Sequence, residues 1–236
     1  RDSSTSRGLG DVYKRQVPVM AALYLVGALV VILINIQHVP SAIASIFICA
    51  FRPDAVFGAA AGITVRKAMR YGVARGLFSN EAGMGSTPHA HARATAENPH
   101  KQGLCAMISV FIDTFIVLNL TVFSILTTNS LSSGKDGIML TQYAFSTVFG
   151  SFGDIFIAVC LLFFAFSTIL GWHFFGSINV KHLFGKKGMV PYSVLVAVFI
   201  VVGSMLKVDL VWTLADFFNG LMAVSYTHLT LPTNRE

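Results

Sequence analysis

Five long apolar stretches constrain the fold of this chain more than any other feature. Each is close in length to the roughly 20 residues that a helix needs to cross a bilayer core. Of the 236 residues, 54% are hydrophobic and 12% are charged, against about 25% charged in soluble domains. One soluble core of this size cannot bury so much apolar surface. We therefore predict an all-α polytopic membrane protein, with spanning stretches at residues 17–36, 103–127, 154–177, 190–206 and 208–224.

Two further regions differ from these stretches. Residues 39–51 are too short to span, and their mixed pattern favours a helix lying at the membrane interface. Residues 54–102 must cross the membrane if the flanking stretches are to alternate, yet they are rich in glycine and charge. Irregular backbone at membrane depth is tolerated only where protein or a water-filled cavity surrounds it. Residues 54–102 are therefore the predicted functional region.

The basic residues predict the orientation of the chain. The formal net charge is +6, but the basic residues lie between apolar runs and form no stripe typical of nucleic-acid binding. Lys and Arg favour cytoplasmic loops. We place the loops 86–102 and 178–189 in the cytoplasm and the loop 128–153, which carries only Lys135, on the opposite side. The cytoplasmic loops carry Arg93, Lys101, Lys181, Lys186 and Lys187.

The two ends of the chain do not resemble its middle. Residues 1–16 and 225–236 are polar and show no periodicity. Asp11–Gln16 and Val224–His228 can be encoded by inverted copies of one DNA sequence, as in a transposon end used for sequencing libraries. Two disordered tails are the alternative. We set both ends apart from the fold and take residues 17–224 as the transmembrane fragment.

The stretch GLFSNEAGMGS, residues 76–86, predicts a broken helix. Each glycine destabilises a helix interior by about 1 kcal/mol relative to alanine, and Ser79 and Asn80 favour caps and turns. An unwound segment exposes N–H groups and carbonyl groups that together suit the carboxylate and ammonium of an amino acid. The alternative is a cytoplasmic loop that precedes a helix capped by Ser79.

Four strings carry a resemblance to a known family. RGLFSNEAGMGS (75–86), FIDT (111–114), FAFSTILGW (164–172) and DLVWTLADFFNGLMA (209–223) resemble the alanine/glycine:cation symporter family, also called sodium:alanine symporters. The resemblance implies a LeuT-like fold of two inverted repeats, of which this chain resembles helices five to ten. The family's first helix, with its own broken segment, is missing, so we expect the fragment not to transport alone. Asp216 and Asn219 belong to the last string, and their role stays open.

The resemblance implies a substrate site and a cation site. Small residues around the break suit a small amino acid, and Trp172 can wall the pocket, although a lone Trp more often anchors a helix at the interface. The predicted substrate-binding residues are Phe78, Ser79, Asn80, Glu81, Ala82, Gly83 and Trp172.

Three polar side chains inside apolar stretches are the predicted cation ligands: Asp113, Ser167 and Thr168. A carboxylate in the bilayer costs about 3 kcal/mol on insertion scales, so Asp113 needs a partner or a role. The alternatives are a pair with Arg75 or a protonated side chain. Sodium is a hard ion that prefers oxygen ligands, which the two hydroxyls supply unless they only bond back to the i−4 carbonyl.

We therefore predict a secondary active transporter that couples sodium entry to uptake of alanine or glycine, in the cell membrane of a bacterium. Sodium is the coupling ion, and no other cofactor, metal or nucleic acid is expected; the histidines of residues 89–100 do not have metal-site spacing. Another small amino acid or proton coupling is the alternative. An intramembrane enzyme using Glu81 and Asp113, or a structural membrane subunit, are the alternatives from other classes.

Overall fold

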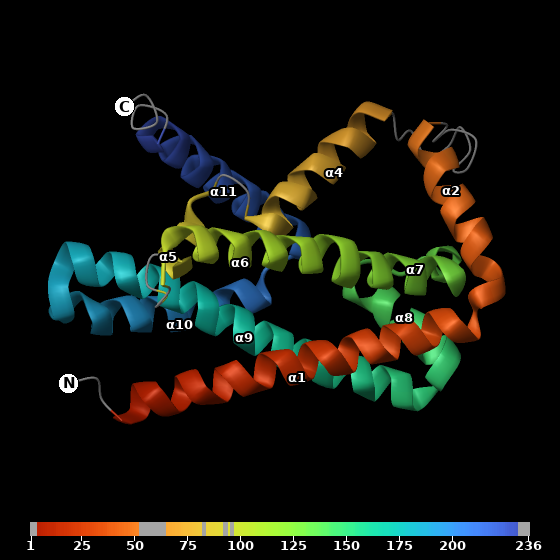
Figure 1. Ribbon diagram of the computed structural model, residues 1–236, viewed down its shortest axis with the longest axis horizontal. Coiled ribbons are helices and arrows are strands. Elements are labelled where there is room, and N and C mark those ends of the chain that lie inside the picture. Colours follow the sequence, from red (N-terminus) through yellow and green to blue (C-terminus); the bar gives the residue numbers. More distant parts are fainter. Residues whose placement is uncertain (1–3, 52–64, 82–83, 92–93, 95–96, 231–236) are drawn as a thin grey trace. The chain divides into compact units, whose positions relative to one another are not determined.

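The computed structural model describes residues 4–51, 65–81, 84–91, 94 and 97–230, and the regular structure in these ranges is helical (Figure 1). The chain divides into two compact units. The first contains Arg1–Lys67 and Phe111–Ile169, and the second contains Ala68–Val110 and Leu170–Glu236. Each unit is described separately below.

The first unit is built on the long helix α1 (Ser4–Ile34). A short 3-10 helix, η1 (Ile36–His38), leads into α2 (Val39–Phe51), which confirms the predicted helix at residues 39–51. The remaining elements of this unit are the π-helix η3 (Ile112–Leu118), α7 (Asn119–Thr127), the 3-10 helix η4 (Ser130–Ser133), α8 (Ile138–Phe149) and the first half of α9 (Ser151–Phe184).

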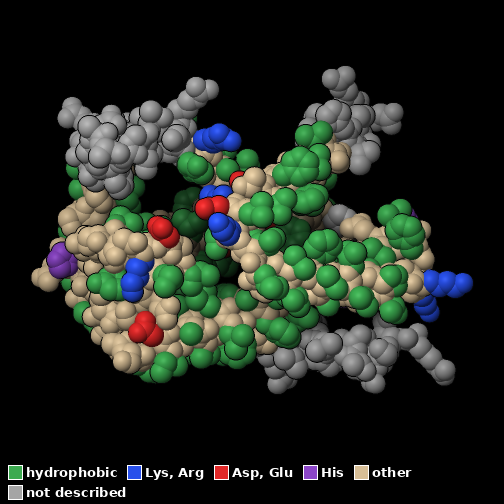
Figure 2. Space-filling view, turned by 180° about the vertical axis from the view of Figure 1, so that it is seen from behind, with side chains coloured by type: hydrophobic (Ala, Val, Ile, Leu, Met, Phe, Trp, Pro, Cys, Tyr) green, Lys and Arg blue, Asp and Glu red, His purple; other side chains and the backbone are tan. Residues whose placement is uncertain are grey.

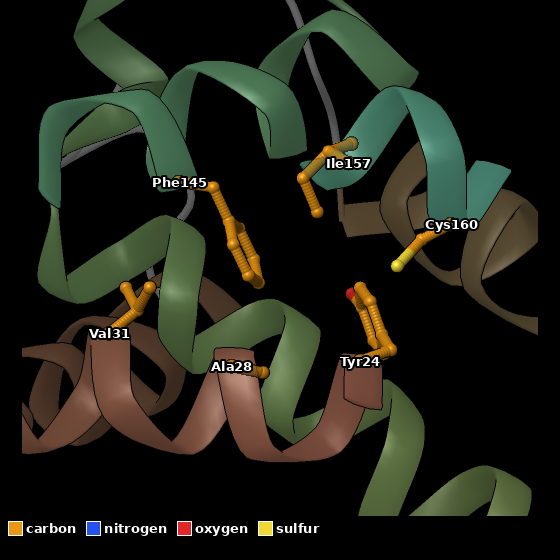
Figure 3. Packing of buried hydrophobic residues seen from close by; sticks show 6 residues of the cluster. All are labelled: Tyr24, Ala28, Val31, Phe145, Ile157 and Cys160. Atoms are coloured by element: carbon orange, nitrogen blue, oxygen red, sulfur yellow. The ribbon is translucent and has the colours of Figure 1, made fainter. Parts of the chain in front are cut away.

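Three helices supply the core of the first unit. Tyr24, Ala28 and Val31 lie on one face of α1 because they are spaced four and three residues apart. They meet the fully buried ring of Phe145 from α8, together with Ile157 and Cys160 from α9 (Figure 3). The rings of Tyr24 and Phe145 are stacked, with their centroids 5.9 Å apart.

Helix α7 joins this core through a small buried side chain. The hydroxyl of Ser124 donates to the carbonyl of Leu120 at 2.8 Å and lies 3.4 Å from the carbonyl of Ala28 in α1. Small residues at such a contact let two helix backbones approach closely, as is common in membrane helix packing. The hydroxyls of Tyr24 and Thr121 add a hydrogen bond of 2.6 Å between the same two helices.

Helix α8 corrects the prediction that residues 128–153 form only a loop. It spans Ile138–Phe149 and follows Gly137, whose φ of 56° is in the left-handed region. The turn at Gly150, with φ 60°, separates it from α9. With 12 residues, α8 is too short to span a bilayer. A search for apolar stretches of spanning length therefore does not detect α8, although its residue Phe145 lies in the core of the first unit.

The second unit contains α4 (Val65–Asn80), α5 (Ser86–His91), α6 (Pro99–Phe111), the end of α9, the 3-10 helix η5 (Gly185–Gly188), α10 (Met189–Met205) and α11 (Val208–Thr230). Helix α9 continues to Phe184, so the predicted loop 178–189 is reduced to the short turn of η5. Gly185, with φ 65°, starts that turn.

The turn at η5 folds α10 back along the end of α9. The hydroxyl of Tyr192 donates to the carbonyl of His173 at 3.3 Å, and the two rings lie 5.2 Å apart. Gly176 leaves room for this contact: a Cβ there would lie 2.0 Å from the Tyr192 hydroxyl, so the tyrosine side chain would have to shift. The predicted stretches 154–177 and 190–206 are thus two antiparallel helices.

The described helices carry four segments long and apolar enough to span a membrane. They are Gln16–Ile34, Pro99–Thr127, Ser151–Met205 and Val208–Tyr226. The third has 55 residues and contains the turn at η5, so it corresponds to two of the five predicted stretches. Large hydrophobic side chains cover much of the visible surface (Figure 2), and α10 has no buried residue. Such a surface is typical of contact with lipid or with further helices.

The helices also extend into the two ends that the sequence sets apart. The backbone of α1 is helical from Ser4, and that of α11 is helical to Thr230. The separate origin of residues 1–16 and 225–236 stays a prediction.

Candidate functional site

The predicted break in the functional region lies between α4 and α5. Helix α4 ends at Asn80, Glu81 follows with a left-handed φ of 51°, and α5 begins at Ser86 after Gly85, whose φ is 80°. The amide of Glu81 donates to the carbonyl of Phe78 at 3.3 Å, which closes the last turn of α4. The helix therefore unwinds inside the predicted segment.

The break starts later than the glycines predict. Helix α4 continues through Gly76, where a Cβ would have nothing within 4 Å. One glycine costs a helix about 1 kcal/mol, which is too little to interrupt it alone. Phe78, Ser79 and Asn80 therefore lie in the last turn of α4, so Ser79 does not cap a helix start. Ala82 and Gly83 lie outside the described residues.

The carboxylate of Glu81 is held by the residues that begin α5. One of its oxygens accepts hydrogen bonds from the hydroxyls of Ser86, at 2.6 Å, and Thr87, at 3.1 Å. The side chain of Ser86 is buried. Glu81 thus fixes the two ends of the turn to each other, in addition to its predicted role as a substrate ligand.

A cluster of four side chains joins the last two turns of α4 to α11. The guanidinium of Arg75 forms two hydrogen bonds with the carboxylate of Asp216, at 2.8 and 3.4 Å. It also lies over the ring of Trp212, 4.1 Å from the ring centroid. The ring of Phe78 meets Trp212 edge to face at 5.5 Å. We call Arg75, Phe78, Trp212 and Asp216 the α4–α11 cluster.

A small cavity of about 270 Å³ lies beside this cluster. Its walls come from both sides of the break and from α11. The lining residues are Arg70, Ala74, Leu77, Phe78, Met84, Asp216, Asn219, Gly220 and Ala223. Phe78 precedes the break and Met84 follows it, so residues on both sides of the break line the cavity. A larger cavity of about 790 Å³ touches Asn80, Glu81, Gly85 and Thr87, among other residues of this unit.

Asp113 lies at the start of the π-helix η3, inside the spanning segment Pro99–Thr127. Its side chain is partly exposed. The side-chain Nδ2 of Asn119 donates to the carbonyls of Thr114 and Phe115, at 3.0 and 3.2 Å, at the end of this π-helix. Single π-turns are frequent at functional sites. Arg75, the alternative partner proposed for Asp113, forms an ion pair with Asp216.

The hydroxyls of Ser167 and Thr168 both donate to the carbonyl of Phe164, each at 2.9 Å. For Thr168 this is the bond to the i−4 carbonyl that is the alternative to a cation site, and Ser167 bonds to the i−3 carbonyl. These bonds use only the hydroxyl protons, so the oxygen lone pairs can still accept or ligate. Ser167 is buried, with 8% of its surface exposed, whereas Thr168 is exposed. Their cation role stays a prediction.

Trp172 lies on α9 with its ring edge to face against Phe175, at a centroid distance of 5.9 Å. It belongs to the second unit, as do Phe78–Glu81, whereas Asp113, Ser167 and Thr168 belong to the first. The contact of Trp172 with substrate stays a prediction.

The α4–α11 cluster was not predicted from the sequence. Trp212 and Asp216 are four residues apart and therefore share a face of α11, which is visible in the string WTLAD. Nothing in the sequence pairs this face with Arg75, which lies 141 residues from Asp216.

Apolar helices, one of them interrupted by a polar turn, as in the described part of this chain, are typical of secondary transporters. The chain matches the model of the Sodium:alanine symporter family over residues 4–230 and belongs to this family.

Three curated relatives illustrate the similarity. An uncharacterized transporter of Haemophilus influenzae is 44% identical over 209 residues, covering 88% of this chain and 46% of the relative. The probable sodium/glutamine symporter GlnT of Bacillus subtilis is 41% identical, covering 88% and 43%. The sodium/alanine symporter AgcS of Methanococcus maripaludis is 37% identical, covering 88% and 46%. The chain thus spans slightly less than half the length of these relatives.

The family match distinguishes between the classes of protein that the sequence left open: a transporter, an intramembrane enzyme and a structural membrane subunit. Its members are transporters, and the relatives are named as amino-acid carriers and symporters. The chain therefore belongs to a family of transporters and not of enzymes, and its described helices include four segments able to span a membrane.

Proposed function

We propose that this chain is part of a sodium-coupled symporter that carries alanine or glycine into the cell across the plasma membrane, which in a bacterium is the inner membrane. The fold proposed for the whole protein is the LeuT-like inverted repeat, and this chain corresponds to about helices five to ten of it. The family match and the names of the relatives support the transport of an amino acid together with a cation.

The observation that carries the proposal is the turn between α4 and α5. The carbonyls at the C-terminal end of a helix carry partial negative charge, which suits the ammonium group of an amino acid. The backbone amides of the turn suit its carboxylate. The proposed substrate-binding residues are Phe78, Ser79, Asn80, Glu81, Ala82 and Gly83, with Trp172 as a wall of the pocket.

The size of the cavity beside the turn supports a small substrate. Its volume is about 270 Å³, and Phe78, Met84 and Asn219 are among its lining residues. A small amino acid fits such a space together with a few water molecules, whereas a large aromatic side chain needs a wider cavity.

The proposed cation ligands are Asp113, Ser167 and Thr168, and the proposed ion is sodium. The two hydroxyls keep free lone pairs after donating to the carbonyl of Phe164, and sodium prefers such hard oxygen donors. A carboxylate inside a spanning segment is costly and is often retained for ion coupling.

The test replaces Gly83 with leucine in the complete gene product that contains this sequence. Gly83→Leu favours a continuous helix and fills the approach to the turn, so we expect labelled alanine binding to be abolished while membrane insertion persists. Gly72→Leu is the matched control, because a Cβ at Gly72 has nothing within 4 Å. Near-normal alanine binding by Gly83→Leu would place the substrate elsewhere.

A second candidate substrate is glutamine. The probable sodium/glutamine symporter GlnT is 41% identical to this chain, whereas the sodium/alanine symporter AgcS is 37% identical. A third relative is named as a sodium/proton-dependent alanine carrier, which favours testing protons as well. Uptake of labelled alanine, glycine and glutamine, with sodium present or replaced by choline and at two pH values, distinguishes these alternatives.

A further inference from the structure

The α4–α11 cluster connects α11 to the proposed substrate segment through three successive contacts. Asp216 holds the guanidinium of Arg75 with two hydrogen bonds, Arg75 covers the ring of Trp212, and Trp212 meets the ring of Phe78. Phe78 is the first residue of the proposed substrate segment. The chain leaves the helix three residues later, at Glu81.

The geometry of the two helices makes these contacts act together. Arg75 and Phe78 are three residues apart on α4, and Trp212 and Asp216 are four residues apart on α11, so each pair shares one face of its helix. The indole of Trp212 contacts both the guanidinium of Arg75 and the ring of Phe78. Displacement of Arg75 therefore removes the group that covers one side of the indole, and the indole in turn supports Phe78.

An ion pair alone would not be enough for this role. The side chains of Arg75 and Asp216 are 36% and 47% exposed, and pairs of that exposure usually contribute little to stability. Here the two-point geometry fixes the plane of the guanidinium, and the stacking on Trp212 adds a cation–π contact. We therefore expect the ion pair to orient the guanidinium of Arg75 more than it stabilises the fold.

We propose that Asp216 is a positioning residue for the substrate segment: through Arg75 and Trp212 it fixes Phe78 at the wall of the small cavity. This role rests on the proposed function of the segment. Asp216 also lines that cavity itself. Without Asp216, Phe78 visits orientations that do not bind substrate, so the binding-competent fraction falls and the apparent affinity falls with it.

The first test follows the indole of Trp212 in the chain itself. The sequence has two tryptophans, so Trp172→Phe leaves Trp212 as the one reporter. In this background, Asp216→Asn and Arg75→Gln should each shift the emission to longer wavelength and increase quenching by acrylamide in detergent micelles. Asp209→Asn is the matched control, because Asp209 lies two turns earlier on α11 and forms no ion pair among the described residues. Unchanged emission in Asp216→Asn would overturn the proposal.

The second test measures uptake by the complete gene product with both tryptophans present. Asp216→Asn should raise the amino-acid concentration for half-maximal uptake by about tenfold, which corresponds to about 1.4 kcal/mol. The maximal rate should stay within about twofold, because the positioning role acts on binding. Asp216→Glu keeps the charge and should recover most of the affinity, and Asp209→Asn should behave as wild type.

The outcomes separate this proposal from the proposed function. Absence of sodium-dependent amino-acid uptake by the wild-type protein counts against the proposed function, and the emission of Trp212 then still tests the contact of Asp216 with the cluster. Wild-type uptake with an unchanged half-saturating concentration in Asp216→Asn overturns the positioning role alone. An equal loss of maximal rate in Asp216→Asn and Asp216→Glu, with unchanged half-saturation, also overturns it.

Discussion

Replacing Gly153 with alanine tests the packing of α8 against α9, the feature of the first unit that was not predicted. Gly153 is buried in the first turn of α9, just after the turn at Gly150. A Cβ at this position would lie 2.5 Å from the carbonyl oxygen of Phe145 and 2.9 Å from the amide of Ser146. Both are backbone atoms of α8, so no side-chain rotation can relieve the overlap. The two helices must separate.

The size of the effect follows from two opposing terms. Alanine improves helix propensity over glycine by about 1 kcal/mol, whereas overpacking of a tight contact costs about 1–3 kcal/mol. Because the overlap is with backbone, we take the upper end of that range. The net expectation for Gly153→Ala is a loss of about 2 kcal/mol in the free energy of unfolding.

Gly171→Ala, in the same helix, is the matched control. A Cβ at Gly171 has nothing within 4 Å, so only the propensity term remains and the variant should gain up to about 1 kcal/mol. Unfolding of the purified chain by denaturant in mixed micelles, followed by far-ultraviolet circular dichroism, measures both. If Gly153→Ala is as stable as Gly171→Ala, the close contact between α8 and α9 is refuted.

Three further predictions test the topology, the cation site and the break in the complete gene product. Cysteines placed at Lys135 and Lys187 should react with a membrane-impermeant reagent from opposite faces; labelling of both from outside contradicts the predicted orientation. Joint replacement of Ser167 and Thr168 by alanine should raise the sodium concentration for half-maximal uptake, and an unchanged sodium dependence removes them from the coupling site. Glu81→Gln weakens two hydrogen bonds to the start of α5 and should lower substrate affinity severalfold, as measured by labelled alanine binding; wild-type affinity would show that the turn does not depend on this carboxylate.

The sequence predicted the features of this fold that depend on local composition. Long apolar runs identify spanning helices because the bilayer sets a minimum length. The predicted stretches 17–36, 103–127 and 208–224 each overlap a described helix that is long and apolar enough to span. The same criterion passes over α8, because its 12 residues cannot span. Its contribution depends on Phe145 meeting α1, which is a long-range contact.

In the candidate site, too, the local sequence predicts the local structure but not the contacts between residues distant in the chain. The polar and glycine-rich residues predict that a helix breaks near residue 80, and it does. Where it breaks depends on more than propensity, because α4 tolerates Gly76 and stops only at Asn80. The sequence indicated Arg75 only as an alternative partner of Asp113, whereas Arg75 forms an ion pair with Asp216 of α11, a pairing that local patterns do not encode.

The turn that interrupts the helix is held at both of its ends by different chemistry. On the α4 side, Phe78 is packed against Trp212 of the α4–α11 cluster. On the α5 side, the carboxylate of Glu81 accepts from the hydroxyls of Ser86 and Thr87. A left-handed φ at a non-glycine residue costs of order 1–3 kcal/mol, and hydrogen bonds to a charged group contribute about 1.5–3 kcal/mol each when well formed. The two bonds to Glu81 therefore suffice to keep its backbone in the left-handed conformation. Irregular backbone is tolerated at membrane depth where protein surrounds it, and these contacts of Phe78 and Glu81 place protein groups on both sides of the turn.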